Sequence, residues 1–247
     1  MSTIRGRNRY APSASEAFEL SRSRLESFVK CPRCFYLDRR LGIEPPRSPP
    51  YTLNNAVDEL LKKEFDLYRA KKQPHPLMKQ HGIEAVPYAH PALDDWRNNK
   101  KGIRHHHRKT NLVVFGAIDD VWAKPDGELI IADYKCTSTA GEITLDDAWK
   151  NAYKRQIEVY QWLFRMNGFK VSATGYFVYC NARKQEAGFS GCLKFETVVI
   201  PYEGDTGWVE DALVEAQRCL AGDSLPEPAE ECDYCDYRAL AADAEDP

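Results

Sequence analysis

The spacing of hydrophobic residues predicts a long amphipathic helix in the first third of the chain. Between residues 53 and 70 the apolar positions recur with the period of an α-helix that buries one stripe. The stripe is expected to consist of Leu53, Val57, Leu60, Leu61 and Tyr68. Glu64 falls inside this stripe, and a buried charge there is expected to form a salt bridge with an arginine.

An earlier helix is expected to begin near Ser23. Ser23 and Glu26 have the spacing of a capping box, in which each residue satisfies a backbone group of the other. Cys31 and Pro32 are expected to end or kink this helix, because proline cannot donate the backbone hydrogen bond that a helix interior requires.

A third helix is predicted over roughly 145–166, with Thr144 as its N-cap. Its inward face is expected to carry Trp149, Ala152, Tyr153, Gln156, Tyr160 and Leu163. A closing helix is predicted over 208–220.

Strands are expected between these helices. Residues 111–123 and 128–136 are rich in β-branched and aromatic residues and flank the turn sequence Lys-Pro-Asp-Gly, so they are predicted to pair as a hairpin. Further strands are expected at 171–180 and 193–200. Helices interleaved with strands in this order predict an α/β fold with a central mixed β-sheet flanked by helices.

The chain of 247 residues suits one main domain. Residues 1–20 are polar and expected to be flexible, and 21–240 are expected to form the domain, with an irregular insertion at about 72–109. No signal region and no run long enough to span a membrane is visible, so a cytoplasmic protein without membrane association is expected.

The net charge of −3 gives no general attraction to nucleic acid, so contacts to phosphate would come from local basic patches. Candidates are Arg39 and Arg40 near the first helix and Lys101 and Arg104 in the basic stretch 98–109. Such contacts would be made mainly to phosphates and would carry no sequence preference. A solvated basic surface is the common alternative for each of them.

The strand at 128–136 ends in an acid and a base, Asp133 and Lys135, whose side chains lie on the same face of the strand. Asp119 on the partner strand could bring a second carboxylate to the same end. Two carboxylates can hold Mg²⁺ or Mn²⁺, and an ammonium beside them can stabilise charge on a phosphate or assist a nucleophilic water. Asp-x-Lys alone is short and common, and more often marks a solvated strand end.

Gln156 and Tyr160 are neighbours on the inward face of the third helix. A polar amide in an apolar stripe needs hydrogen-bond partners, and an active site would supply them. A satisfied core glutamine remains the alternative.

Taken together, Gly116-x-x-Asp119, Asp133-x-Lys135 and Gln156-x-x-x-Tyr160 resemble the PD-(D/E)xK nuclease superfamily, in particular its RecB-like branch, which includes CRISPR-associated exonucleases with iron–sulfur clusters. The resemblance spans about residues 21–238 and implies a restriction-endonuclease-like core. It implies that Asp119, Asp133 and the carbonyl of Tyr134 bind the metal ion and that Lys135 is catalytic. Gln156 and Tyr160 would position DNA or support the site.

Two acidic residues require a choice. Where this family often has a histidine on the preceding helix, the chain has Asp58, which could serve as a carboxylate ligand or be a surface acid. Asp120 competes with Asp119, but adjacent strand residues face opposite sides, and the family pattern selects Asp119.

Two Cys-x-x-Cys pairs, Cys31 with Cys34 and Cys232 with Cys235, lie at opposite ends of the chain. Four thiolates suffice for zinc or an iron–sulfur cluster, and this site would join the two termini. Iron–sulfur nucleases of the resembling branch close their fold in a similar way, although they usually use one early and three late cysteines. A 4Fe–4S cluster is therefore expected, with Zn²⁺ as the alternative.

These patterns predict a Mg²⁺- or Mn²⁺-dependent deoxyribonuclease acting on single- or double-stranded DNA in repair, recombination or defence. The alternative is a catalytically inactive nucleic-acid-binding protein of the same fold. A third and less favoured interpretation is a metal-stabilised adaptor that binds only protein. The sequence gives no protein partner, cleavage polarity or oligomeric state.

Overall fold

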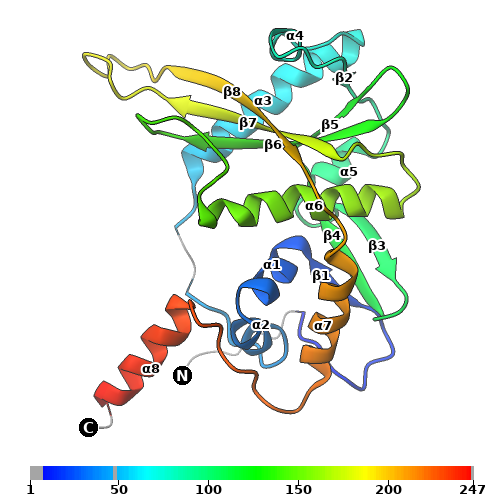
Figure 1. Cartoon of the computed structure of the whole chain (residues 1–247), viewed down its shortest axis with the longest axis vertical. Helices are drawn as coiled ribbons and strands as arrows, with labels where there is room; N and C mark the ends of the chain where they lie inside the picture. The colour runs from blue at the N-terminus through cyan, green and yellow to red at the C-terminus, as the bar shows by residue number, and fades with distance from the viewer. Residues whose placement is uncertain (1–7, 47–48, 246–247) are drawn as a thin grey trace. The chain divides into compact units, whose positions relative to one another are not determined.

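The computed structural model describes residues 8–46 and 49–245. Contacts group the chain into two compact units. The terminal unit combines the chain up to Pro49 with Arg104–Phe115 and the chain from Gly207 onward, and the sheet unit combines Pro50–Ile103 with Gly116–Thr206. Figure 1 traces the elements of both units along the chain.

The terminal unit contains a three-stranded sheet in the order β1-β4-β3, formed by β1 (Phe18–Ser21), β3 (Ile103–His107) and β4 (Leu112–Gly116). Strands β1 and β4 run parallel. The helices of this unit are α1 (Arg22–Lys30), α2 (Pro32–Arg39), α7 (Val209–Ala221) and α8 (Asp233–Glu245). Residues 1–7 of the segment expected to be flexible lie outside the described residues, and its end is ordered as β1.

The expected break between the first two helices is confirmed. Helix α1 ends at Lys30, Cys31 adopts an extended conformation, and Pro32 occupies the first turn of α2, where its missing N–H is harmless. The expected start was wrong. Ser21 is the N-cap and makes no side-chain cap, because its hydroxyl lies 3.0 Å from the hydroxyl of Ser23.

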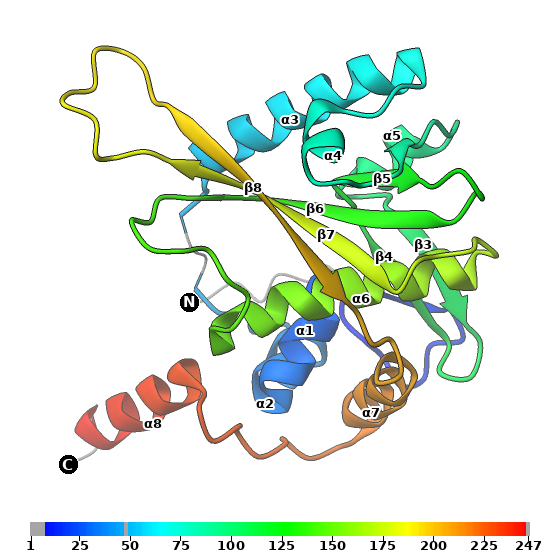
Figure 2. The same cartoon turned by 45° about the horizontal axis from the view of Figure 1, so that its top comes forward.

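The sheet unit is built on a five-stranded sheet in the order β2-β5-β6-β7-β8. Its strands are β2 (Val86–Pro87), β5 (Asp120–Ala123), β6 (Leu129–Thr137), β7 (Thr174–Ala182) and β8 (Phe195–Glu203). Strands β6 and β7 are parallel and the other pairs are antiparallel, so the sheet is mixed, as expected. Helices α3 (Thr52–Lys71) and α6 (Asn151–Met166) cover its opposite faces (Figure 2).

Alternation along β6 decides which residues face which helix. Ile130, Ala132 and Tyr134 pack in the core cluster that contains Leu61 and Phe65 of α3. Positions 133 and 135 point the other way, towards the face covered by α6, because side chains alternate along a strand. Both faces of β6 are therefore buried, which explains its nearly continuous apolar sequence.

Helix α3 buries a different stripe from the one expected. Leu61, Phe65 and Arg69 are its buried residues, whereas Leu53 and Leu60 are exposed. Arg69 can be buried because its guanidinium pairs with the buried carboxylate of Asp120. Arg69 was not part of the stripe expected from the sequence, and its pairing with Asp120 is what allows α3 to bury it.

The stretch 111–123 forms two strands in two different sheets. Strand β4 ends at Gly116 and β5 begins at Asp120, so Asp119 lies in the connection rather than within a strand. The predicted hairpin with β6 is confirmed for β5. Its turn is closed by the Lys124 N–H, which donates to the Glu128 carbonyl at 2.9 Å, and Gly127 supplies the positive φ of 80° that the turn requires.

The remaining helices of the sheet unit are α4 (Pro76–Gln80) and α5 (Leu93–Arg97). They lie with β2 and β3 in the range 72–109, where the sequence showed no clean period because each element is short. Before α6 a 3₁₀ turn, Ala148–Lys150, replaces the expected first helical residues, so Thr144 is not the N-cap.

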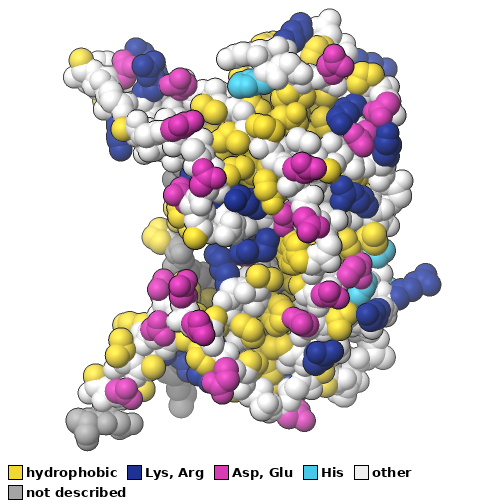
Figure 3. All heavy atoms as spheres, in the orientation of Figure 1, with side chains coloured by type: hydrophobic (Ala, Val, Ile, Leu, Met, Phe, Trp, Pro, Cys, Tyr) yellow, Lys and Arg dark blue, Asp and Glu magenta, His cyan; other side chains and the backbone are white. Residues whose placement is uncertain are grey.

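Within the described residues, no helix combines the length and apolar content needed to cross a bilayer. Acidic and basic side chains are mixed over the face shown in Figure 3, in keeping with the small net charge.

Candidate active site

Asp119 and Asp133 come together because β5 and β6 pair antiparallel. Asp120 is the register partner of Ala132, so Asp119, the residue just before β5, is carried to the Asp133–Tyr134 part of β6. The backbone N–H of Tyr134 donates to Oδ2 of Asp119 at 2.9 Å, which fixes this carboxylate against the end of β6.

Lys135 lies beside both carboxylates. Its ammonium forms an ion pair with Oδ2 of Asp133 and lies 3.5 Å from Oε1 of Gln156. Burial opposes the charge, but Asp133 and Asp119 outweigh this effect and raise the pKa of Lys135 above its ordinary value. The lysine is therefore held protonated in the folded protein.

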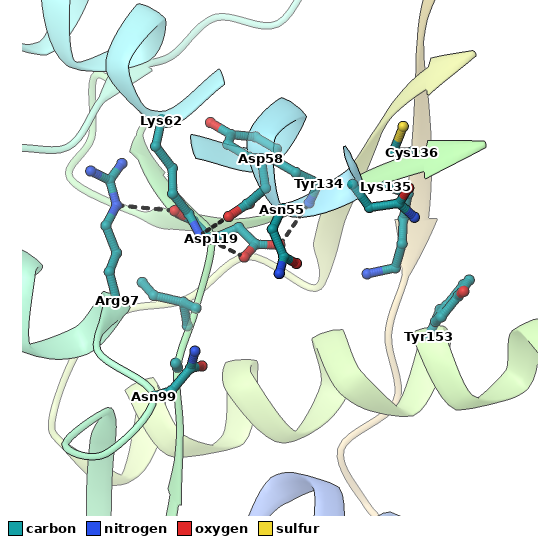
Figure 4. Close-up of a pocket in the computed structure, with 13 residues that line it drawn as sticks. Asn55, Asp58, Lys62, Arg97, Asn99, Asp119, Tyr134, Lys135, Cys136 and Tyr153 are labelled. Atoms are coloured by element: carbon teal, nitrogen blue, oxygen red, sulfur yellow. Dashed lines mark hydrogen bonds and ion pairs between the residues drawn. The ribbon is translucent and has the colours of Figure 1, made fainter. Parts of the chain in front are cut away.

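A cavity of about 310 Å³ opens at this end of β6. Its lining is mostly polar and includes Asp58, Lys62, Arg97, Asp119, Tyr134 and Lys135. Figure 4 shows Asp58 and Lys62 reaching towards Asp119 from α3. Asp133 is completely buried and reaches this region through its ion pair with Lys135.

Asp58 and Asp119 converge on one positive charge. The Lys62 ammonium lies 2.7 Å from Oδ2 of Asp58 and 3.1 Å from Oδ1 of Asp119. Burial and the nearby Asp119 raise the pKa of Asp58. Burial also acts against ionisation of Asp119, but Lys62, Lys135 and the Tyr134 N–H outweigh it and lower the pKa of Asp119.

The donor set fits a hard divalent cation. Asp58 and Asp119 come from different elements, α3 and the connection before β5, yet both carboxylates reach the same ammonium. Carboxylate oxygens arranged around one cation are the ligands that Mg²⁺ and Mn²⁺ prefer. The two carboxylates are thus chemically suitable for such an ion, which would compete with the Lys62 ammonium for them.

Asp120 has a separate, structural role. Its buried carboxylate accepts hydrogen bonds from Arg69 at 2.5 Å, Arg97 at 3.0 Å and the Tyr134 hydroxyl at 2.9 Å. Because this set of partners fully engages Asp120 on the α3 side of the sheet, only Asp119 faces the cavity. The choice of Asp119 over Asp120 agrees with this arrangement.

Lys62 and Arg97 were missed by sequence reasoning. Arg97 donates from Nε to the carbonyl of Asp119 at 3.0 Å and from its terminal nitrogens to Asp66 and Asp120, so it holds the connection in place. Lys62 follows Asp58 by one helical turn, a spacing that was visible in the sequence. Arg97 gave no such signal, because the fold alone brings it to Asp119.

Gln156 and Tyr160 join the site from α6. The Gln156 amide nitrogen lies 3.5 Å from the Tyr160 hydroxyl, and that hydroxyl donates to the carbonyl of Ala117 at 2.5 Å. Tyr160 thereby anchors the connection that carries Asp119, while Gln156 contacts Lys135. The structure places Gln156 beside Lys135 and its partner Asp133, and Tyr160 beside the connection that carries Asp119.

A family model described as the PD-(D/E)XK nuclease superfamily matches residues 19–240. The chain belongs to the PD-(D/E)XK nuclease superfamily. Its mixed α/β architecture, with sheets flanked by helices, is consistent with the fold of this superfamily. Membership implies a nucleic acid substrate and use of divalent metal ions.

Among solved structures, the crystal structure of SSO0001 is similar to this chain, with 15% sequence identity and a TM-score of 0.41. The match covers 90% of this chain and 84% of that chain. No curated protein matches the chain.

Glu64 on α3, which the sequence placed in the buried stripe, is not buried. Its carboxylate is exposed and pairs with Nε2 of His75 at 3.0 Å, so the expected buried salt bridge with an arginine was wrong. The α3 stripe rotates away from Glu64 because Leu61 and Phe65 face the sheet.

The basic residues expected to contact nucleic acid differ in accessibility. Arg39 is buried and pairs with Asp38 and Glu44 of the chain, and Arg40 is half-buried. Lys101 is exposed and pairs with Asp95. Arg104 is exposed on β3, where it pairs with Glu19. Lys101 and Arg104 are thus each exposed, whereas Arg39 is not.

The four cysteines gather within the terminal unit of this nuclease-superfamily chain. Their Sγ atoms all lie within 4.8 Å of one another, with Cys34 3.5 Å from Cys232 and 3.6 Å from Cys235, and Cys31 3.8 Å from Cys235. Burial would raise the pKa of Cys31, but backbone N–H groups and the other thiols lower it to about 7. The remaining cysteines, Cys136, Cys180, Cys192 and Cys219, are free thiols elsewhere.

Four sulfur ligands from two Cys-x-x-Cys pairs form the donor set of a structural zinc site or an iron–sulfur cluster. Cys31 and Cys34 come from the start of α2, and Cys232 and Cys235 from the start of α8. The expected four-cysteine group at the chain ends is therefore formed, and it fits a thiolate-bound metal.

Proposed function

We propose that this chain is a Mg²⁺- or Mn²⁺-dependent deoxyribonuclease of the RecB-like branch that hydrolyses phosphodiester bonds. The observation that carries the proposal is the convergence of Asp58 and Asp119 on one cation beside a protonated Lys135. The contact of Gln156 with Lys135 and the bond from Tyr160 to Ala117 support the assignment to this branch, whose motif contains both residues.

In this proposal Asp119 and Asp58 hold the divalent ion, with the Tyr134 carbonyl and Asp133 as the further ligands that the motif implies. When bound, such an ion acts as a Lewis acid that lowers the cost of negative charge on the phosphate. Asp119 is pre-positioned for this role by the Tyr134 N–H and by Arg97, which holds its carbonyl.

Lys135 is proposed to supply a positive charge and a hydrogen-bond donor. Its raised pKa keeps the ammonium protonated, which favours donation of a hydrogen bond to a phosphate oxygen over removal of a proton from water. Asp133 and Gln156 hold the ammonium from the α6 side, so they orient it towards the cavity. Stabilisation of charge in the transition state is the contribution assigned to this lysine.

The four cysteines are proposed to bind a 4Fe–4S cluster, with Zn²⁺ as the alternative. Their place at the starts of α2 and α8 supports a structural role in the terminal unit. DNA repair, recombination and defence are the processes that such a nuclease would serve.

A second candidate function is nucleic-acid binding without turnover. The observation that favours it is Lys62, whose ammonium lies between the two carboxylates that would hold the metal. If no divalent ion displaces Lys62, the chain keeps the fold and the basic surface but lacks hydrolysis.

Linear single- and double-stranded DNA, incubated with the intact protein and Mg²⁺ or Mn²⁺, tests these functions. Cleavage is expected with the native chain, and Lys135→Ala is expected to lower the rate by about 10²-fold or more. Lys170→Ala, which removes an exposed lysine of the segment between α6 and β7 that pairs with Asp126, serves as the control and should cleave normally. Salt-sensitive binding without cleavage by either ion would favour the second function.

A further inference from the structure

A second cavity of about 190 Å³ lies next to the candidate active site within the sheet unit. It shares Lys135, Cys136 and Tyr153 with the first cavity. In Figure 4 Lys135 extends from β6 towards the side of α6 that carries Tyr153. A group bound in the second cavity would therefore be adjacent to a phosphate placed at Lys135.

Trp149 forms an exposed aromatic wall of this second cavity. Its side chain is 61% exposed, although the sequence placed it on the inward face of the third helix. The 3₁₀ turn before α6 is the reason, since it turns Trp149 out of the helical stripe. The tryptophan packs edge-on against Tyr153, with ring centroids 5.5 Å apart at 81°.

The turn that carries Trp149 is firmly held. The neighbouring Lys150 is buried, and its ammonium lies 2.7 Å from both the Asp147 carboxylate and the Thr144 carbonyl. The same ammonium lies 5.1 Å from the Trp149 ring, and the Lys135 ammonium lies 4.5 Å from the Tyr153 ring. An exposed indole in a fixed position presents a flat apolar face at little further entropic cost on binding.

The polar groups of the second cavity suit a neutral hydrogen-bonding ligand better than a phosphate. Its lining combines the carboxylates of Glu142 and Asp147 with the ammonium groups of Lys135 and Lys150, so the charges balance and leave no excess of positive charge to attract a phosphate. Tyr179 also lines it, is only 2% exposed, and has a hydroxyl without a hydrogen-bond partner among the described residues. A flat ligand with polar edges would satisfy both the indole face and these groups.

We propose that this second cavity binds an unpaired nucleobase of the substrate strand, stacked on Trp149, next to the phosphate that is cleaved. The proposal rests on the function proposed above and names its substrate class as single-stranded DNA or the frayed end of a duplex. A base inside a duplex cannot stack on a protein ring until it is unpaired, whereas every unpaired base offers a face for stacking.

Binding of fluorescein-labelled oligonucleotides to the intact protein, measured by anisotropy without added divalent cation, tests the proposal separately from cleavage. The native chain is expected to bind a single strand more tightly than a blunt duplex of the same length. Trp149→Ala is expected to weaken single-strand binding by about tenfold, the effect of one lost base stack, and to leave duplex binding unchanged. Trp149→Phe should retain most of the affinity.

Two controls make the experiment specific. Phe189→Ala removes an aromatic residue of similar exposure, 72%, outside this cavity and should leave single-strand binding unchanged. A strand with abasic positions should bind the native chain and Trp149→Ala equally well, because the stacking partner is missing. Circular dichroism of each variant verifies that it is folded.

Equal single-strand affinity of the native chain and folded Trp149→Ala would overturn the nucleobase site, even if the protein cleaves DNA. Conversely, a selective loss of single-strand binding in Trp149→Ala, together with no cleavage under any metal condition, would support the nucleobase site and reject the hydrolytic function.

Discussion

The ammonium of Lys62 lies 3.1 Å from a carboxylate oxygen of Asp119. The same ammonium lies 2.7 Å from Asp58, one helical turn earlier on α3, so a lysine of the protein bridges the two acids proposed to hold the metal. This bridge neutralises part of the negative charge of the two carboxylates. A divalent cation that enters must displace the ammonium, which sets a cost on metal binding.

Replacement of Lys62 by methionine is therefore expected to tighten metal binding. Lys62→Met keeps the length of the side chain but removes the competing charge, and Mn²⁺ affinity should rise by about tenfold or more. Isothermal titration calorimetry or Mn²⁺ electron paramagnetic resonance measures this directly, without DNA.

Lys63→Met is the matched control, since Lys63 makes the same kind of one-turn ion pair, with Glu59, but on an exposed surface. Its Mn²⁺ affinity should equal that of the native chain. Unchanged or weaker Mn²⁺ binding in Lys62→Met would show that Lys62 does not compete with the ion.

Loss of the Asp120 carboxylate is expected to destabilise the sheet unit strongly. Asp120→Ala leaves the buried guanidinium groups of Arg69 and Arg97 without their common partner, and removal of one side of a buried ion pair typically lowers the free energy of unfolding by about 3–5 kcal/mol. Urea denaturation measures the loss. Asp126→Ala breaks an exposed pair with Lys170 and should have no comparable effect, and an equal loss in both variants would contradict this role of Asp120.

Stability is expected to fall in mild acid because of His75. Burial lowers the pKa of His75 below its ordinary 6.5, against the opposing effect of Glu64. Since the unfolded chain then binds the proton more readily, the free energy of unfolding contributed by His75 is complete above pH 6.5 and decreases as the pH falls through and below this value.

Denaturation at about pH 7.5 and about pH 5.5 measures this slope. His75→Asn retains a side chain able to cap the Leu77 N–H at the start of α4 but cannot titrate, so its slope should be smaller than that of the native chain. His81→Asn, at an exposed position, should keep the native slope. The same slope in all three proteins would exclude His75 as the source.

The cysteine group is expected to bind metal and to stabilise the terminal unit. Elemental analysis of protein purified without oxygen should show iron or zinc, and Cys34→Ser should lose this metal together with thermal stability, because metal binding at such a site is part of the folding energy. Cys192→Ser changes an exposed cysteine outside the group and should retain the metal. Equal metal content in the two variants would rule out Cys34 as a ligand.

Much of the architecture could be predicted from local patterns. Pro32 ended α1, the Pro-Asp-Gly turn joined β5 to β6, and long periodic segments gave α3, α6 and α7. These features depend on neighbours in the chain, such as the missing N–H of proline or the positive φ of Gly127. Short elements such as α4, α5 and β2 gave no periodic signal, because too few residues repeat within them.

The error in the buried stripe of α3 concerns charged residues. Glu64 was expected to be buried but is exposed, and the buried stripe of α3 instead includes Arg69, which was not part of the expected stripe. Arg69 is buried because Asp120 neutralises it, and Asp120 lies far away in sequence. A periodic pattern of hydrophobic residues counts every charged residue as polar. It cannot show that two opposite charges far apart in the sequence will pair in the core.

The motif residues Asp119, Asp133 and Lys135 were predicted from the sequence alone, from strand alternation, from the expected hairpin and from the family resemblance. Only the tertiary structure decided what surrounds them. Lys62 bridges two carboxylates, Arg97 holds the Asp119 backbone, and the exposed Trp149 lines the same second cavity as Lys135. These relationships arise from packing of α3, α5 and α6 around the sheet, and distances between separate elements are not encoded in any local pattern of residues.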